Sequence, residues 1–542
     1  MKNRLHVTPT FALAILILQA LVGGAGLAQV VTNVATITGD PAPDGNGSFS
    51  VPFNNPVLND SGQVAFSVGL TGTSGDSSDD RGVFRSDGAG NTLQIVREGE
   101  FAPDGNSIFF NLPNPTFKFG PALNSVGQVV FGARLTGDGR DSLHSGIFRA
   151  NGAGSLVQNA SAGDVAPDGN FADILGGDAL NSFGHVAFSA GLTDTSSGDR
   201  DDSGVFLSDG AGSQLQIARK GDLLPDANGS FSSFNFPFVN DSGQVAFSAG
   251  LTGTSGGSND DLGIFRGDGI GSPVQIVRKG APAPDGNGRF SSFDHPTLNE
   301  AGQAAFRGFM TDTNGGSSDN IGIYRGDGNG SPVQIARGGD PVPDGSNSFL
   351  HFSFPAQNNA GQIAFDARLT DASNGTIEEH GLYFHDDLNG LTEIARTGDP
   401  APDGNGTIQA FGTPAVNDSG QVAFVGLIAD SVGNEDVCNF SVNGCSDFGL
   451  YLYDELGNLH QLARSGDDFL GSRIMDLRFA SDAHPAFNGP AQSGLNAQGQ
   501  VAFRFRLMDG REGIAIASVV PEPSAFGLAV FAYSALMLRR RR

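Results

Sequence analysis

The chain has 542 residues and a formal net charge of −27, with 58 acidic against 31 basic residues. Nucleic acid is therefore not an expected partner, because binding to a phosphate backbone requires clustered cations. Only two cysteines are present, too few for a metal site built from cysteine ligands alone.

The N-terminus has the pattern of a secretory signal peptide. Lys2 and Arg4 precede an apolar run from Phe11 to Val22, and small residues follow up to Ala28. This order of charge, apolar core and small-residue cleavage site predicts export, with residues 1–28 removed after Ala28. A buried N-terminal helix is the alternative, which the charges and the cleavage pattern disfavour.

A unit of about sixty residues then recurs eight times and is recognised by Asn-x-x-Gly-x-x-Ala-Phe. The copy at residues 240–247 reads Asn-Asp-Ser-Gly-Gln-Val-Ala-Phe. The eight copies begin at Asn59, Asn124, Asn181, Asn240, Asn299, Asn358, Asn417 and Asn496. Such periodicity indicates a repeat architecture with one supersecondary unit per copy.

Each copy divides into four short apolar strands separated by turn residues. In residues 230–280 we expect strands within 230–239, at 244–252, at 263–266 and at 274–278. Asn or Asp at the start of a turn and Gly within it favour hairpins. Four antiparallel strands per copy predict one blade of a β-propeller. The second strand has large residues on one face and small ones on the other, as expected where blades stack.

The strand types predict how the ring closes. The last repeat lacks its fourth strand, while an unpaired strand of that type, residues 34–39, stands before the first blade. We therefore predict an all-β fold of eight four-stranded blades, closed by the N-terminal strand, over residues 29–518. A seven-bladed ring with an outlying unit, and two smaller β domains, remain alternatives. The closed ring predicts buried core side chains at Phe66, Phe188, Phe247, Phe306, Phe365, Phe424 and Phe503.

Two loop types are acidic and are predicted to lie at the same end of each blade. One is the Pro-Asp-Gly turn before the first strand, and the other contains paired aspartates before the third strand. Oxygen-rich loops suit hard cations, so weak Ca²⁺ binding is one hypothesis for the paired aspartates. Plain turns and a soluble surface are the simpler interpretation. The candidate ligands are Asp79, Asp80, Asp201, Asp202, Asp260 and Asp261.

Recurrent arginines also follow the repeat. Six of them end the fourth strand, next to the acidic loops, where they could pair with carboxylates, although exposed pairs contribute only about 0–1 kcal/mol. We interpret them as edge-strand charges that discourage aggregation of sheets. They are Arg97, Arg219, Arg278, Arg337, Arg396 and Arg464. Two Arg-Gly-Asp sequences, beginning at Arg266 and Arg325, occupy a position where other copies differ. We interpret them as tight turns and not as adhesion motifs.

The longest interval between repeats contains both cysteines. Cys438 and Cys445 are seven positions apart in sequence, and an oxidising compartment would allow a local disulfide between them.

The C-terminus combines three features. Pro521, Glu522 and Pro523 are followed by an uncharged segment, residues 524–538, and by four arginines at 539–542. A helix of this length is short for a permanent membrane anchor, and the arginines indicate that the end stays cytoplasmic.

This tail resembles the PEP-CTERM sorting signal of Gram-negative bacteria, and the tandem motif resembles the Asn-x-x-Gly-x-x-Ala-Phe repeat family. The resemblance implies a transmembrane sorting helix in residues 519–542 that is processed by an exosortase-type protease. It further implies a protein that is transiently anchored in the membrane and then reaches the cell surface or the extracellular matrix. The repeat family implies no activity.

The sequence contains no recognisable catalytic motif. Nine histidines are scattered over non-equivalent positions, and no nucleophile elbow or phosphate-binding loop is present. We therefore expect a non-enzymatic protein without a cofactor, other than the Ca²⁺ considered above, that binds or organises extracellular polysaccharide or matrix. The alternative is a secreted carbohydrate-active enzyme that uses carboxylates on the loop-rich face of the propeller.

Overall fold

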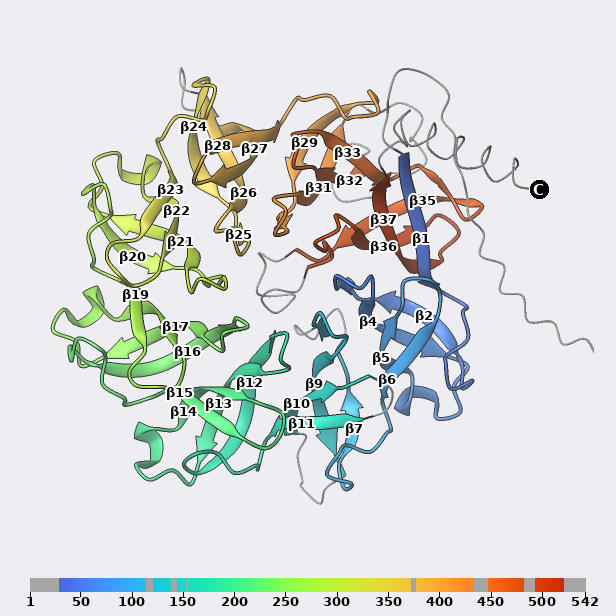
Figure 1. Cartoon of the computed structure of the whole chain (residues 1–542), viewed down its shortest axis with the longest axis horizontal. Helices are drawn as coiled ribbons and strands as arrows, with labels where there is room; N and C mark the ends of the chain where they lie inside the picture. Colours follow the sequence, from blue (N-terminus) through green and yellow to red (C-terminus); the bar gives the residue numbers. More distant parts are fainter. Residues whose placement is uncertain are drawn as a thin grey trace, which may run out of the picture.

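The strands form eight antiparallel sheets arranged as blades around a common centre (Figure 1). The computed structural model describes residues 29–520, except for 114–119, 138–143, 153–154, 372–376, 430, 432–446 and 482–492. Within this part of the chain the only helices are four 3-10 turns. The prediction of an all-β, eight-bladed propeller is therefore confirmed.

We number the blades in chain order. Blade 1 contains β2 (Ser48–Phe53), β3 (Val57–Leu58), β4 (Val64–Thr71), η1 (Asp76–Ser78), β5 (Arg81–Ser86) and β6 (Thr92–Arg97). Blade 2 contains β7 (Ile108–Asn111), β8 (Ala122–Leu123), β9 (Val129–Thr136), β10 (His144–Ala150) and β11 (Leu156–Ser161). Blade 3 contains β12 (Asn170–Leu180), β13 (Val186–Thr193), η2 (Gly198–Arg200), β14 (Ser203–Ser208) and β15 (Gln214–Arg219). Blade 4 contains β16 (Ser230–Val239), β17 (Val245–Thr252), η3 (Gly257–Asn259), β18 (Leu262–Gly267) and β19 (Val274–Arg278).

The second half of the ring repeats this order. Blade 5 contains β20 (Arg289–Phe293), β21 (Ala304–Thr311), η4 (Gly316–Ser318), β22 (Ile321–Gly326) and β23 (Val333–Arg337). Blade 6 contains β24 (Asn347–Phe352), β25 (Ala356–Gln357), β26 (Ile363–Asp371), β27 (Ile377–Asp386) and β28 (Gly390–Arg396). Blade 7 contains β29 (Thr407–Phe411), β30 (Ala415–Val416), β31 (Val422–Ala429), β32 (Asp447–Tyr453) and β33 (Leu459–Arg464). Blade 8 contains β34 (Asp468–Phe469), β35 (Ser472–Phe479), β36 (Val501–Leu507), β37 (Glu512–Val520) and, from the other end of the chain, β1 (Gln29–Ile37).

The number of strands differs between blades. The sheets of blades 3, 4 and 5 have four strands, and the other five sheets have a fifth, short strand. In blade 1 the extra strand arises because the first strand is interrupted, so that β2 and β3 both pair with β4. Blade 4 matches the predicted division closely, since β16 and β19 have the expected bounds.

The N-terminal strand closes the ring. β1 pairs antiparallel with β37 from Gln29 opposite Val520 to Ile37 opposite Gly513. This contact joins two segments that are more than 470 residues apart, and both lie at the same blade in Figure 1. The predicted closure of the eighth blade is thus confirmed.

The hydrophobic core lies between successive blades. One cluster joins small and aliphatic residues of blade 3, such as Ala187 and Val205, to Phe231, Phe247 and Phe265 of blade 4. The seven phenylalanines predicted as core are all fully buried. The junction between blades 8 and 1 follows the same rule, with Ala502 and Ile514 packed against a phenylalanine cluster of blade 1. Large side chains of one blade therefore fill the face that small side chains leave on the blade before it.

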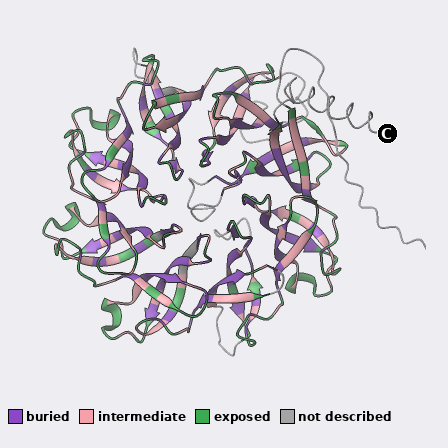
Figure 2. Cartoon of the chain, viewed as in Figure 1, coloured by how far each residue is buried: buried purple, intermediate pink, exposed green. Residues whose placement is uncertain are grey.

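Exposed residues gather on the loops at the outer edge of the ring (Figure 2). The short helical turns, which belong to the loops with paired aspartates, also lie at this outer edge in Figure 1. The short strand β25, which precedes Asn358, lies on the inner side of its blade. The Asn-x-x-Gly turns thus point toward the centre, and the acidic loops of different blades point away from one another.

Several predictions concern residues outside the described part of the chain. These are the signal peptide with Ala28, the sorting motif Pro521, Glu522 and Pro523 with its helix, and the disulfide between Cys438 and Cys445. In the part that the structure describes, no helix has the length and apolar character needed to cross a membrane.

Candidate functional site

Five of the six arginines that end the fourth strands are buried, and Arg396 is partly buried. The prediction that they are exposed edge charges is therefore wrong, whereas the pairing with nearby carboxylates that the sequence allowed is present. Arg337 is the clearest example, with an exposed fraction of 1%. Its Nη1 donates to both carboxylate oxygens of Asp285 at 2.7 Å, and its Nε donates to the carbonyl of Asp319 at 2.8 Å. The guanidinium thereby ties the Pro-Asp-Gly turn to the loop before the third strand within one blade. Sequence analysis considered pairing with the acidic loops but not the burial of the arginine or this particular partner, which lies 52 residues earlier in the chain.

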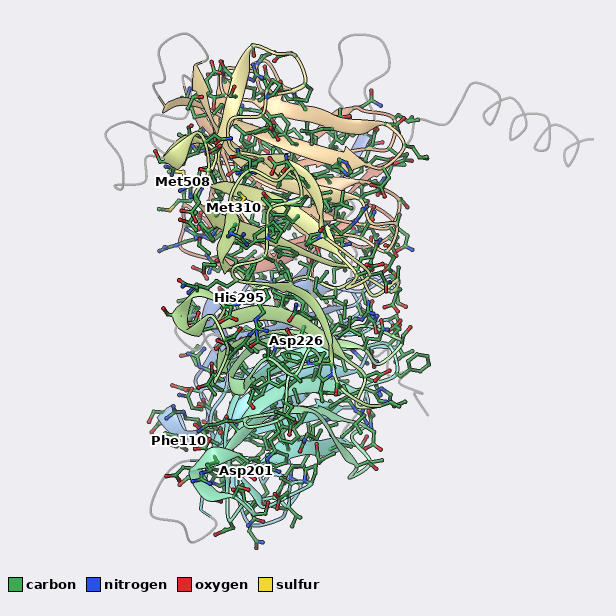
Figure 3. All side chains as sticks on the ribbon, turned by 90° about the vertical axis from the view of Figure 1, so that its left-hand side faces the viewer. Phe110, Asp201, Asp226, His295, Met310 and Met508 are labelled. Carbon is green, nitrogen blue, oxygen red and sulfur yellow. The ribbon has the colours of Figure 1, made fainter. Side chains whose placement is uncertain are left out.

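The same ion pair recurs around the ring. Its members are Arg97 with Asp44 (2.8 Å), Arg219 with Asp168 (3.1 Å), Arg278 with Asp226 (2.9 Å), Arg396 with Asp344 (3.3 Å) and Arg464 with Asp403 (2.6 Å). In the side view of Figure 3, which labels Asp201 and Asp226, polar side chains cover much of the outer surface. These six turn aspartates therefore have a structural partner, in addition to their role in the turn.

The first aspartate of each predicted pair faces into its own blade. Asp260 accepts hydrogen bonds from the hydroxyl of Thr254 and from the amide of Asn228 (3.1 Å), and it pairs with Arg278 at 3.3 Å. Partial burial would raise the pKa of Asp260, but the hydrogen bonds from Thr254, Gly256 and Asn228 outweigh it and lower the pKa. Asp79 and Asp201 hold equivalent positions beside Arg97 and Arg219.

The second aspartate of each pair lies further out. Asp202 and Asp261 form ion pairs of 2.8 Å with Lys220 and Lys279. Among the described residues, no three His, Cys, Asp or Glu side chains are grouped so that they could hold a metal ion. The Ca²⁺ hypothesis for these loops stays a prediction, and it now has to compete with the cationic partners just described.

Blade 1 departs from this pattern at Glu98, which stands where blades 3 and 4 have Lys220 and Lys279. Glu98 has an exposed fraction of 7%, and its Oε1 accepts a hydrogen bond from the backbone N–H of Leu112 in blade 2 at 3.0 Å. Burial, reinforced by the neighbouring Asp80, raises the pKa of Glu98 to about 7. The carboxyl groups of Glu98 and Asp80 thus lie close together at the junction of blades 1 and 2.

The repeat asparagines form a ring at the centre of the molecule. Each has an exposed fraction of 7% or less. In seven of the eight blades the Nδ2 of this asparagine donates to the backbone carbonyl of the asparagine in the next blade, over 2.8–3.1 Å. The last link, from Asn496 to Asn59, again joins blade 8 to blade 1.

The same side chain also builds its own turn. The Oδ1 of Asn240 accepts from the backbone N–H of Gln244 at 2.9 Å, while Gly243 takes a φ of 76°. A glycine is favoured at such a positive φ. Sequence analysis explained the turn but missed the links between blades. The strict recurrence of Asn was the signal, because a turn alone also tolerates Asp.

The Arg-Gly-Asp sequences serve the same junctions. Nη1 of Arg266 donates to the carbonyl of Gly302, and Nη1 of Arg325 donates to the carbonyl of Gly361, in each case in the next blade. Asp268 accepts the backbone N–H of Ile270 at 2.8 Å. These contacts fit the interpretation as turns.

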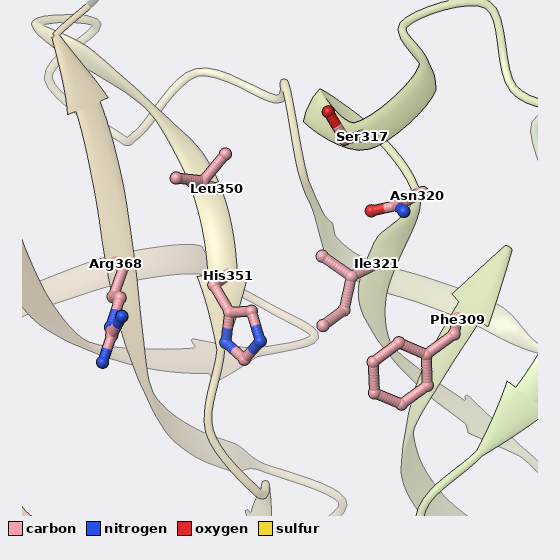
Figure 4. A pocket seen from close by; sticks show the side chains of 7 residues that line it. All are labelled: Phe309, Ser317, Asn320, Ile321, Leu350, His351 and Arg368. Atoms are coloured by element: carbon pink, nitrogen blue, oxygen red, sulfur yellow. The ribbon is translucent and has the colours of Figure 1, made fainter. Parts of the chain in front are cut away.

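A surface cleft of about 300 Å³ lies between blades 5 and 6 (Figure 4). Blade 5 contributes Phe309, Ser317, Asn320 and Ile321 to its lining, and blade 6 contributes Leu350, His351 and Arg368. His351 and Arg368 are opposite each other in the register of β24 and β26. Sequence analysis did not single out this cleft, since its polar residues occupy positions that vary between repeats.

Cationic and aromatic side chains dominate this region. The guanidinium of Arg307 lies 5.3 Å from the ring centre of Phe309 and 4.6 Å from that of Phe354. Burial, together with the charges of Arg307 and Arg368, lowers the pKa of His351. At neutral pH the imidazole is therefore uncharged, and the guanidinium of Arg368 is the positive group of the lining.

A family profile matches most of the chain. The profile, described as a family of unknown function (DUF7453), matches residues 26–174, 166–399 and 388–526. The chain belongs to this family. The DUF7453 matches together span the eight blades, and the description names no activity. A search of curated proteins found no match.

Solved structures with a similar arrangement of strands include enzymes of different kinds. The acylaminoacyl peptidase of Pyrococcus horikoshii is 12% identical with a TM-score of 0.37, and the match covers 76% of this chain and 52% of the peptidase. An α-L-arabinanase of Penicillium chrysogenum, complexed with arabinobiose, is 14% identical with a TM-score of 0.27, covering 73% of this chain and 94% of the enzyme. The sialidase of Trypanosoma rangeli is 11% identical with a TM-score of 0.29, and the match covers 80% of this chain and 60% of the sialidase.

This DUF7453 chain thus spans about half the length of the peptidase that it matches. Similarity at this level carries no argument about activity. The geometry of the chain's own residues has to carry any functional inference.

Proposed function

We propose that this protein is exported, is processed at its C-terminal tail by an exosortase-type protease, and acts at the cell surface without catalysis. Its role is to bind or organise extracellular polysaccharide or matrix. One observation supports this most: the recurrent carboxylates of blades 1 and 3–7 are engaged by arginines, five of them buried, that hold the loops together. A rigid acidic ring built in this way suits a scaffold or binding surface.

The binding role is tested by cosedimentation of the purified protein with exopolysaccharide from the producing bacterium. We expect the protein to pellet with the polysaccharide in a saturable manner. A protein that stays in the supernatant at every polysaccharide concentration would contradict this role. Localisation tests the export route: deletion of residues 519–542 should release the protein into the medium, whereas the full chain should pass through a membrane-bound form.

A secreted carbohydrate-active enzyme remains the second candidate, and Glu98 favours it. A carboxyl group with a pKa of about 7 near a second carboxylate is the kind of pair that glycoside hydrolases use as acid and base. A hydrolysis screen on bacterial exopolysaccharides separates the two candidates. Turnover that disappears in Glu98→Gln and in Asp80→Asn would favour the enzyme over the scaffold.

A further inference from the structure

We propose that the cleft between blades 5 and 6 binds a carboxylated sugar, specifically a hexuronate residue of an acidic polysaccharide. This inference rests on the proposed association with polysaccharide and names the part of the molecule that recognises it. Its chemistry comes from three groups that the cleft brings together: an unpaired guanidinium, an aromatic ring and uncharged polar side chains.

Arg368 supplies the positive charge. Its side chain is exposed and forms no hydrogen bond or ion pair with a described residue. The Oδ1 of Asp366, two residues earlier on β26, lies 3.6 Å from the imidazole Nδ1 of His380; the charge of Arg368 also acts on this carboxyl group, but without a hydrogen bond or ion pair. A free guanidinium matches a carboxylate with two parallel hydrogen bonds, which is the strongest and most directional pairing open to this side chain.

An arginine at the strand position of Arg368 is not always without a carboxylate partner. Blade 8 has Arg506 at the equivalent place on β36, and that arginine lies 3.8 Å from Glu512. Arg368 and Arg506 therefore share a strand position but differ in whether a carboxylate of the protein already occupies the guanidinium. This contrast provides a matched control.

Phe309 supplies an apolar surface on the opposite wall of the cleft. Its ring is half-buried, lies next to Ile321 on the same wall, and has the guanidinium of Arg307 5.3 Å from its centre. Binding sites combine such apolar walls with a few polar groups that fix orientation. The C–H face of a pyranose can pack on the phenylalanine ring while its carboxylate reaches Arg368 across the cleft.

The uncharged polar groups can contact sugar hydroxyls. Ser317 and Asn320 lie on the blade 5 wall, and neither side chain forms a hydrogen bond with a described residue. His351 lies beside Arg368 as a neutral imidazole, able to donate one hydrogen bond and accept another. The net charge of −27 repels polyanions in general, so an acidic saccharide needs a local site of this kind.

Calorimetric titration of the purified protein tests the site. The probes are a galacturonic acid trisaccharide and the neutral galactose trisaccharide with the same linkage. We expect the uronate to bind more tightly than the neutral sugar. Arg368→Gln should weaken uronate binding about tenfold or more, as expected for loss of a charged hydrogen bond. Arg506→Gln should leave the affinity for the uronate unchanged. Phe309→Leu should weaken the binding of both sugars.

Three results would overturn the inference: no uronate binding, equal affinity for the two sugars, or an Arg368→Gln variant that binds uronate like the wild type. Thermal melting of each variant verifies that it is folded. Cosedimentation with whole exopolysaccharide separates this inference from the proposed function. If Arg368→Gln still pellets like the wild type, the binding role stands and the cleft is not its site. If the trisaccharide binds in the cleft but the protein never pellets, the site stands and the broader role fails.

Discussion

The centre and the outer edge of the ring use buried polar side chains for different purposes. At the centre, neutral asparagines donate hydrogen bonds from one blade to the next. At the outer edge, charged arginines bind carboxylates of their own blade. The central asparagines, together with Arg266 and Arg325, link neighbouring blades, whereas the outer ion pairs shape each blade and its loops. The four predictions below probe these two regions, in order of decreasing expected effect.

The largest effect is expected at the outer edge. Arg337→Ala removes a buried guanidinium that binds Asp285 and two backbone carbonyls. Because Asp285 is itself partly exposed, we expect the free energy of unfolding to fall by about 3 kcal/mol. This is the lower end of the range for removing one partner of a buried ion pair. Denaturant unfolding measures it. Arg396→Ala is the control, since this arginine is more exposed and should cost less.

At the centre, Asn240→Ala should cost about 2 kcal/mol. The change removes the link to the carbonyl of Asn299 and leaves the partly buried N–H of Gln244 without its acceptor. Asp241→Ala, in the same turn, is the control, because among the described residues the Asp241 side chain accepts a single interblade hydrogen bond, from the backbone N–H of Ser182. Equal losses of stability in the two variants would argue against a special role for the asparagine ring.

A third prediction concerns pH at the junction of blades 1 and 2. Burial raises the pKa of Glu98 from its usual 4.5 to about 7. The folded state therefore holds this proton more tightly than the unfolded chain. The resulting stabilisation is complete below pH 4.5 and is lost as the pH rises through 7. Glu98→Gln keeps a side-chain oxygen that can accept the N–H of Leu112, but it removes the ionisable group.

Melting temperatures of the wild type and of Glu98→Gln, measured from pH 4.5 to 8, test this. We expect the wild type to lose stability relative to the variant as the pH rises. Asp261→Asn, in a pair that contains a lysine, serves as the comparison. Parallel curves for the wild type and Glu98→Gln would contradict the assignment.

The smallest effect is expected from calcium. A site with a Kd of about 10⁻³ M, typical of weak extracellular sites, stabilises the fold by only about 0.4 kcal/mol at an equal Ca²⁺ concentration. A melting curve with and without chelator measures the change. The outer aspartates Asp80, Asp202 and Asp261 would have to provide it. An unchanged melting temperature in millimolar Ca²⁺, with no heat on titration, would remove the hypothesis.

Much of the fold was predictable because the repeat exposes it. Eight copies of one pattern fixed the strand order, and the missing partner of the last repeat identified β1 as the closing strand. The buried phenylalanines followed from strand alternation. Contacts between distant polar side chains did not follow, because nothing local distinguishes a buried arginine at the end of a strand from an exposed one.

The candidate site could not be predicted from the sequence, for the opposite reason. Arg368, His351 and Phe309 come from two repeats, and none belongs to the recurring pattern. Only the packing of blade 5 against blade 6 brings them together. The repeat therefore predicts what every blade shares, and the cleft depends on what two particular blades do not share.

Closure of the ring by the N-terminal strand is the central claim, and disulfide trapping tests it most directly. Val31 and Ser518 are register partners between β1 and β37 and are both half-buried. The double variant Val31→Cys/Ser518→Cys should form a crosslink rapidly under mild oxidation and raise the melting temperature. Val31→Cys/Val520→Cys, two residues out of register, should crosslink slowly. Absence of a crosslink in the first pair, or equal rates in both, would contradict the closed eight-bladed ring.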